Sequence, residues 1–153
     1  MVNSFETAKE KLTAYLTETK KSKTIARYNV LKAVYEQKSC FTAEELYQQI
    51  NANSKDRVCF ATVYNTLLIL QDCKLIVKYR LDNAVSQYYE VASETEYHHF
   101  IVCSECGAMR KFIDVRLQNT IRSKTFKGFK AQKHTLTIYG LCTACSRKKK
   151  KKG

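Results

Sequence analysis

The sequence predicts an α+β fold that is divided into two small domains, and three observations lead to this prediction. Apolar side chains recur at helical spacing through the first seventy residues. Two strand-like stretches follow these helices, and further short strands flank one helix in the second half of the chain. Two Cys-x-x-Cys pairs, separated by 35 residues, lie in that second half.

The helices at the start of the chain are predicted from apolar spacing and from capping residues. A loose apolar stripe marks a helix over residues 5–19, and Thr24 is placed to cap a second helix. Thr42 and Glu45 have the spacing of a capping box at the start of a third helix. Phe41 stands in the position of a hydrophobic staple before it.

A fourth helix, over about residues 60–73, is followed by strands at residues 75–81 and 86–91. Asp82 and Asn83 form the expected turn between these strands. Helices followed by a hairpin are the order of a winged helix-turn-helix. Beyond the polar residues 92–97, one helix is expected near residues 115–123, together with four short strands. These strands are predicted at residues 99–103, 108–112, 129–133 and 135–139.

The fourth helix has two contrasting faces. Its apolar arc, which is expected to face a core, consists of Phe60, Val63, Leu67 and Leu70. The opposite arc carries small or hydrogen-bonding residues, which are Ala61, Thr62, Tyr64, Asn65 and Thr66. Such a helix can be an ordinary amphipathic helix, but the hairpin after it, with Lys78 and Arg80 as phosphate contacts, favours a DNA-reading helix. We therefore expect DNA contacts from Thr62, Tyr64, Asn65, Thr66, Lys78 and Arg80.

The charge of the chain agrees with a nucleic-acid partner. The net charge is +13, of which +10 lies in residues 93–153 and six positive charges form the run at residues 147–152. We expect that run to be a disordered, solvated tail that adds at most non-specific phosphate affinity. The sequence contains no apolar run of about 20 residues and no signal-peptide pattern. We therefore expect a cytoplasmic protein with no membrane partner.

The two Cys-x-x-Cys pairs predict a metal site. A spacer of two residues lets both thiolates of a pair reach one ion, and two pairs complete a tetrahedral set of four sulfurs suited to Zn²⁺. Gly107 follows the first pair, where a left-handed turn is often needed. We assign one structural zinc per subunit to Cys103, Cys106, Cys142 and Cys145.

An enzyme is the less favoured function. Four cysteines close the coordination sphere of a zinc ion, whereas a catalytic zinc keeps a position open for solvent. Neither Cys-x-x-Cys pair lies at the start of a helix after a buried strand, as a thioredoxin-like redox pair would. Cys40, Cys59 and Cys73 are isolated, and for each we expect a small buried apolar side chain.

These motifs together resemble the Fur family of metal-responsive bacterial repressors, which includes ferric uptake, zinc uptake and peroxide-stress regulators. The resemblance is carried by residues 61–67, 88–91 and 134–145, and by His98-His99 shortly before the first cysteine pair. It implies a homodimer that binds an AT-rich inverted repeat of double-stranded DNA, with Tyr64 among the base-reading residues. The implied division is a winged-helix DNA-binding domain at residues 1–91, a hinge at 92–97, a zinc-stapled dimerisation domain at 98–146 and a basic tail at 147–153.

The chain departs from the family pattern at the recognition helix and at the metal-sensing site. Members usually carry Arg after the recognition-helix Tyr, where this chain has Asn65. Of the sensing ligands that the family implies, Glu90 is matched, but the positions in the second helix and after the first cysteine pair are Tyr28 and Lys111. The histidine segment is shifted by one residue relative to Cys103, which turns a strand side chain to the other face unless a bulge corrects it.

Two hypotheses follow for the sensing site. In the first, the Lys111 ammonium pairs with Glu90. This pair would partly substitute for the regulatory ion, which holds the two domains in a DNA-competent arrangement. In the second, a weaker site for Fe²⁺, Mn²⁺ or Zn²⁺ is formed by Glu90, His98, His99 and His134, although each histidine can equally be an ordinary packed or surface residue. The alternative for the whole protein is a non-specific nucleic-acid-binding or zinc-binding protein on the same fold that no longer senses metal.

Overall fold

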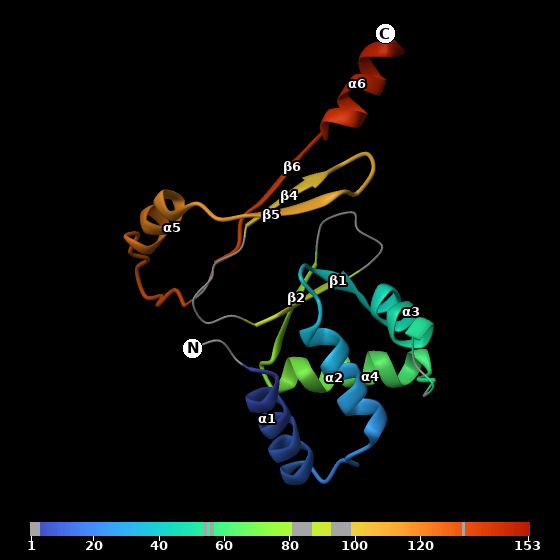
Figure 1. Cartoon of the computed structure of the whole chain (residues 1–153). Coiled ribbons are helices and arrows are strands. Elements are labelled where there is room, and N and C mark those ends of the chain that lie inside the picture. Colours follow the sequence, from blue (N-terminus) through green and yellow to red (C-terminus); the bar gives the residue numbers. More distant parts are fainter. Residues whose placement is uncertain (1–3, 54, 56, 81–86, 93–98, 133) are drawn as a thin grey trace. The chain divides into compact units, whose positions relative to one another are not determined.

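The computed structural model describes residues 4–53, 55, 57–80, 87–92, 99–132 and 134–153. The chain forms two compact units, Met1–Glu94 and Thr95–Gly153, and each is described by itself. The helices and strands of both units are drawn in Figure 1. The predicted α+β class is confirmed, because the described residues form six helices and two small sheets.

The first unit contains four helices and one three-stranded antiparallel sheet of order β1-β3-β2. Helices α2, α3 and α4 contact one another, and α1 packs on α2. The helices are α1 (Phe5–Glu18), α2 (Ile25–Tyr35), α3 (Ala43–Asn53) and α4 (Phe60–Asp72). The strands are β1 (Phe41–Thr42), β2 (Ile76–Tyr79) and β3 (Tyr88–Val91). The turn predicted at Asp82 and Asn83 lies outside the described residues.

Two predicted caps are present in the first unit. The Thr24 side chain accepts a hydrogen bond from the Arg27 amide at the start of α2. The Thr42 amide donates to the Glu45 carboxylate at 2.8 Å, and the Glu45 amide donates to the Thr42 hydroxyl at 3.2 Å. These two reciprocal bonds satisfy donors that a helix start leaves open, and they are the predicted capping box.

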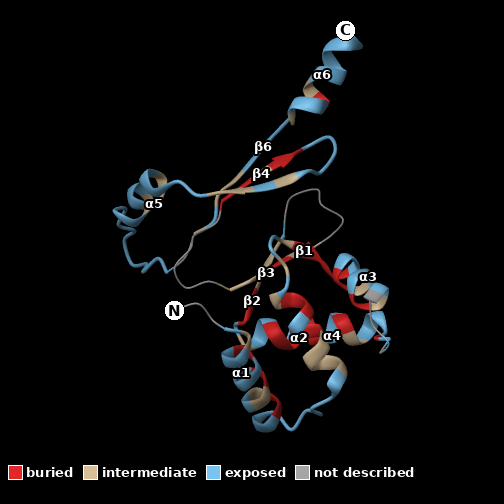
Figure 2. Cartoon of the chain, viewed as in Figure 1, coloured by how far each residue is buried: buried red, intermediate tan, exposed pale blue. Residues whose placement is uncertain are grey.

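A single core cluster joins the helices of the first unit to its sheet, and its buried residues line the inner faces of the helices in Figure 2. Leu12, Leu31, Leu46 and Leu67, one from each helix, are all fully buried in it. Burial of a leucine side chain contributes about 1.5–3 kcal/mol. The cluster therefore holds α4 firmly while leaving the other face of that helix toward solvent.

The second unit contains a sheet of order β5-β4-β6 and two helices. Strand β4 pairs antiparallel with β5 and parallel with β6. The strands are β4 (His99–Cys103), β5 (Met109–Phe112) and β6 (Thr137–Gly140). The helices are α5 (Val115–Arg122) and α6 (Thr143–Lys151), and α5 contains no buried residue.

Two expectations for the second unit are wrong. The strand predicted at residues 129–133 is absent from its described part, where Phe129 only forms an isolated bridge with Phe126. Gly128, between them, has a positive φ of 71° and turns the chain back on itself instead of extending it. The basic run at residues 147–152 was expected to be disordered, but helix α6 continues through Lys151, because Cys142 caps its start and its last turn is basic.

No helix among the described residues has the length and hydropathy needed to cross a membrane.

Candidate metal centre and nucleic-acid interface

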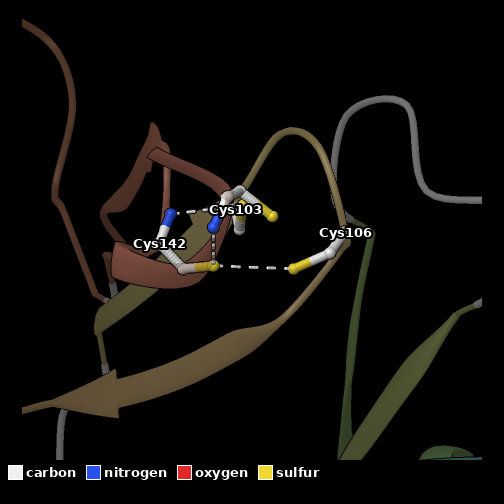
Figure 3. A group of neighbouring side chains, drawn as sticks. Cys103, Cys106 and Cys142 are labelled. Carbon is white, nitrogen blue, oxygen red and sulfur yellow. Dashed lines mark hydrogen bonds between the residues drawn. The ribbon is translucent and has the colours of Figure 1, made fainter. Parts of the chain in front are cut away.

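Four cysteines of the second unit form one cluster. Their sulfur atoms all lie within 4.8 Å of one another, and the Cys106 and Cys142 sulfurs are 3.8 Å apart (Figure 3). Four sulfurs at about 2.3 Å from one zinc ion are separated by about 3.8 Å in a tetrahedron. The predicted set of Cys103, Cys106, Cys142 and Cys145 is therefore brought together, and its spacing fits a zinc ion.

The sheet explains how two cysteine pairs so far apart in sequence meet. Strands β4 and β6 run parallel, with Cys103 opposite Gly140, and the Ser104 amide donates to the Gly140 carbonyl at 2.8 Å. Cys103 ends β4, and Cys142 is the N-cap of α6 two residues beyond β6. The second pair therefore does lie at the start of a helix, which the sequence did not predict, but the strand before it is largely exposed rather than buried. Gly107, with a φ of 72°, closes the first knuckle by donating its amide to the Cys103 carbonyl at 2.9 Å.

Backbone amides and neighbouring thiols set the acidity of the cluster. The amide of Cys142, which lies 3.3 Å from the Cys103 sulfur, and then the amides of Cys106 and Glu105, lower the pKa of Cys103 to about 6. The hydrogen bond with Cys142, followed by burial, raises the pKa of Cys145 to about 12. Because four thiolates at this spacing repel one another, a cation is needed for all four to be ionised together.

In the first unit, α4 is positioned by a polar clamp at its start. The Asn51 side chain donates to the Val58 carbonyl and accepts from the Val58 amide, both at 2.9 Å. Tyr47 packs edge-on against the ring of Phe60, with centroids 5.6 Å apart. Since Asn51 and Tyr47 belong to α3, these contacts fix the angle between α3 and the first turn of α4.

The outward face of α4 differs from the predicted one at two positions. Tyr64 and Asn65 are exposed as expected, and Thr62 is half-buried. Thr66 is 0% exposed, and its hydroxyl donates to the Thr62 carbonyl at 2.7 Å. The expected DNA contact by Thr66 is therefore wrong, because its polar group is satisfied within the helix and its side chain faces the core. Phe60, expected in the core, is 39% exposed.

Leu68 was missed by the sequence analysis. It is 39% exposed and continues the outward stripe of Ala61, Tyr64 and Asn65 at helical spacing. That spacing was visible in the sequence, but a leucine within an apolar run gives no compositional sign that it faces outward. In the hairpin, Lys78 is half-buried on β2 and Arg80 is exposed just after it.

The structure brings together two members of the predicted second metal site. The rings of His99 and His134 are 5.5 Å apart between centroids. His99 is fully buried, and its Nδ1 accepts a hydrogen bond from the Leu136 amide at 3.2 Å, so the neutral ring carries its proton on Nε2 and offers no nitrogen lone pair to a metal in this arrangement. His98 lies outside the described residues. Glu90 belongs to the other unit, which is not placed relative to the histidines.

The three other positions at the implied sensing site have protein contacts of their own. The Tyr28 hydroxyl is 2.8 Å from the Thr13 hydroxyl, which ties α2 to α1. Glu90 is buried on β3, and the Tyr79 hydroxyl donates to its carboxylate at 3.4 Å. Burial and the Glu90 charge both raise the pKa of Tyr79, so this hydroxyl stays protonated and can donate. Lys111 is half-buried on β5, opposite Phe100 of β4.

A winged-helix unit whose helix α4 exposes polar side chains is followed by a small sheet with a cluster of four cysteines. These features define the class of protein, and comparisons with known proteins identify the family. The model of the ferric uptake regulator family matches residues 18–139. The chain is 33% identical over 147 residues to a ferric uptake regulation protein of Campylobacter upsaliensis, covering 94% of this chain and 92% of that protein. It is 28% identical over 134 residues to the peroxide operon regulator of Bacillus subtilis, covering 87% and 90%.

The fold is also that of solved structures of the family. The ferric uptake regulator of Helicobacter pylori aligns with a TM-score of 0.77 at 23% identity, covering 94% of both chains. The ferric uptake regulator of Vibrio cholerae aligns with a TM-score of 0.65 at 25% identity, covering 83% of this chain and 96% of the other. The chain belongs to the ferric uptake regulator family.

Proposed function

We propose that the protein is a dimeric, sequence-specific DNA-binding repressor. The observation that carries this proposal is the outward stripe of α4, which presents Tyr64 and Asn65 to solvent from a helix whose other face is anchored in the core. A helix of this kind can enter a major groove without disturbing its own domain. Membership of a family of transcription regulators supports the same function.

The chemistry of the stripe favours AT-rich DNA. An asparagine amide can pair with both the N6 and N7 groups of adenine, and apolar or aromatic edges can contact the thymine methyl group. We assign base contacts to Tyr64 and Asn65, with Thr62 at the margin, and phosphate contacts to Lys78 and Arg80. Two such helices in a dimer would read the two halves of an inverted repeat.

One zinc ion per subunit is proposed at Cys103, Cys106, Cys142 and Cys145. A closed set of four thiolates makes the ion structural, and its binding energy becomes folding energy for the second unit. That unit has few buried residues of its own, since α5 contributes none. We therefore assign the zinc the role of holding the dimerisation domain together.

The sensing site is proposed to be altered or weakened. Tyr28 is held by Thr13, and Glu90 already accepts a hydrogen bond from Tyr79. A lysine at position 111 adds a positive charge where the family resemblance implies a metal ligand, and this opposes the binding of a second cation. Substitution Lys111→Glu is expected to increase the affinity for Fe²⁺, Mn²⁺ or Zn²⁺, measured by titration calorimetry on protein that already holds its structural zinc. No gain in affinity would count against this role of Lys111.

Binding to DNA tests the main proposal. Fluorescence anisotropy should be measured on AT-rich inverted repeats and on scrambled duplexes at physiological salt, with and without a mild chelator. A specific repressor should prefer its repeat by roughly a thousandfold or more. Equal affinity for both duplexes, lost in parallel as salt rises, would instead identify a non-specific nucleic-acid-binding protein.

A further inference from the structure

Helix α6 carries a dense positive charge that no function assigned above uses. Six cationic residues follow one another at positions 147–152, and the residues of this run up to Lys150 are all exposed. The Lys149 ammonium pairs with the Glu105 carboxylate at 3.1 Å, where both side chains are more than half exposed. After Glu105, the rest of the chain contains a single acidic residue, Asp114. The sequence around α6 therefore supplies far too little negative charge to balance it.

The start of α6 is fixed by the cysteine cluster. Cys142 is its N-cap, the Cys145 amide donates to the Cys142 sulfur at 3.5 Å, and the Ser146 amide donates to the Cys142 carbonyl at 2.9 Å. Cys145 is the buried residue of the helix. A cation bound by these thiols would therefore anchor the first turn, and the basic run would extend from that anchor.

In the absence of an anion, the positive side chains along the rest of α6 repel one another. Residues three and four positions apart face each other on a helix, so Arg147 and Lys151 are neighbours, as are Lys148 and Lys152. Like charges at this spacing disfavour the helix, although lysines in its last turn interact well with the helix dipole. An external polyanion would remove the repulsion and stabilise the helix that the structure contains.

We propose that α6 is an arm that binds the phosphate backbone of double-stranded DNA outside the bases read by α4. The proposal rests on the proposed DNA-binding function. The charge density of α6 fits that of a duplex, because five positive charges (147–151) lie along about 6 Å of the helix, Lys152 follows as its C-cap, and B-DNA carries one negative charge per about 1.7 Å. An anionic membrane fits less well, because a helix that binds at a membrane surface needs an apolar face. After Cys145, every residue of α6 is Ser, Arg or Lys.

A pair of matched variants tests the arm. The arm variant carries Lys148→Gln, Lys150→Gln and Lys151→Gln, and it leaves the pair of Lys149 with Glu105 intact. The control variant removes three charges from exposed lysines of the same unit, by Lys124→Gln, Lys127→Gln and Lys130→Gln. Both variants have the same net charge, and glutamine is a good helix former. Circular dichroism and zinc content should confirm that both variants remain folded.

The readout is the salt dependence of binding to a scrambled duplex and to the AT-rich inverted repeat. Each phosphate contact contributes about 0.9 to the slope of log K against log salt concentration. We expect the arm variant to lose about 2 or more from this slope on both duplexes, which corresponds to a change of roughly tenfold or more between 50 and 200 mM salt. We expect the control variant to keep the slope of the original protein.

The possible outcomes separate this inference from the proposed function. An unchanged slope in the arm variant, or an equal decrease in the control variant, would overturn the role of the arm even if the protein prefers its repeat. A smaller slope on both duplexes in a protein that shows no sequence preference would support the arm and overturn the repressor. Vesicles of phosphatidylserine and phosphatidylcholine provide the remaining comparison, since arm-dependent binding to vesicles with no change on DNA would also overturn the proposal.

Discussion

At the residue scale, two polar side chains of α4 differ in whether they form hydrogen bonds within the protein. This difference decides which of them is available to a DNA partner. Thr66 and Asn65 are adjacent, yet Thr66 is buried and bonded to the Thr62 carbonyl, whereas Asn65 is exposed. A helical wheel assigned both residues to the outward arc. It could not separate them, because a threonine hydroxyl that bonds back to its own helix can be buried at little cost.

This difference predicts the result of two neighbouring substitutions. Asn65→Ala should weaken discrimination against a wrong base pair by about 1–3 kcal/mol, because an exposed amide loses its contact with a base edge. Thr66→Val keeps the shape of the side chain and should leave discrimination unchanged, at a cost of about 1 kcal/mol in stability. Anisotropy titrations on operator variants with single base changes would measure both. A loss of discrimination in Thr66→Val equal to that in Asn65→Ala would contradict the assigned orientation of the helix.

A second prediction at this scale concerns two cysteines outside the metal centre. Cys59 is exposed, so the burial expected for it from the sequence is wrong, and its hydrogen bond with Thr62 lowers the pKa of the thiol below its ordinary value. Burial, and then the charge of Asp72, raise the pKa of Cys73 to about 11. The thiolate is the reactive form, and at pH 8 only about one Cys73 thiol in a thousand is ionised. Iodoacetamide should therefore label Cys59 first, and labelling of Cys73 should rise only as the pH approaches 11.

Mass spectrometry of labelled peptides from zinc-loaded protein gives both rates. Bound operator DNA should slow the labelling of Cys59, which caps the reading helix, and should leave the rate at Cys73 unchanged. Equal protection at both positions would indicate a general effect of DNA on folding rather than contact at α4.

At the element scale, most helices of the first unit were predictable because their starts carry local signals. The Thr24 cap and the Thr42–Glu45 capping box depend on residues three positions apart, and both are present in the structure. The prediction of a strand at residues 129–133 is wrong because it rested on strand-like composition alone. Gly128 instead forms a turn that pairs Phe126 with Phe129 in an isolated bridge. The clamp between Asn51 and Val58 was not predicted, because it joins residues whose proximity depends on the packing of α3 and α4.

The hydrogen bonds of Asn51 lead to a prediction of how much stability the start of α4 owes to this one side chain. Asn51→Ala removes three hydrogen bonds, two with Val58 and one to the Tyr47 carbonyl, and leaves the peptide group of the buried Val58 without these partners, which should cost about 1–3 kcal/mol. Urea denaturation would measure this loss, and hydrogen exchange should show faster opening of the first turn of α4. Gln48→Ala, at an exposed position of α3, is the matched control and should not lose stability. An equal loss of stability in the two variants would contradict the role of the clamp.

At the scale of the whole molecule, the cluster of four cysteines was easier to predict from the sequence than an arrangement of residues at the sensing site. The four cysteines could be assigned because two-residue spacers carry their own geometry, and the structure places all four sulfurs together. The members proposed for the second site lie in two different compact units, with Glu90 in the first and the histidines in the second. The pairing of His99 with His134, across 35 positions in the chain, depends on the sheet and has no local signal.

Removal of one zinc ligand should affect assembly before it affects the reading domain. In Cys145→Ser, we expect zinc content to fall from one per subunit toward zero and the dimer to dissociate at micromolar concentration, while the first unit keeps its helical signal. Cys59→Ser is the control, because it changes an exposed cysteine outside the cluster and should keep zinc and dimer. Zinc analysis and sedimentation would measure the two properties. A stable zinc-free dimer of Cys145→Ser would contradict the structural role of the metal.

The parallel pairing of β4 with β6 has a consequence for the order in which the protein matures. Parallel neighbours need a long connection, so Cys103 and Cys106 must wait until the ribosome has added Cys142 and Cys145 before the four can meet. The first unit, whose core is assembled from elements synthesised earlier, needs no such delay. If the zinc holds the dimerisation domain together as proposed, new chains in a cell short of zinc would accumulate as single copies with a folded first unit and no partner. The supply of this metal would then limit how much of the proposed repressor becomes active.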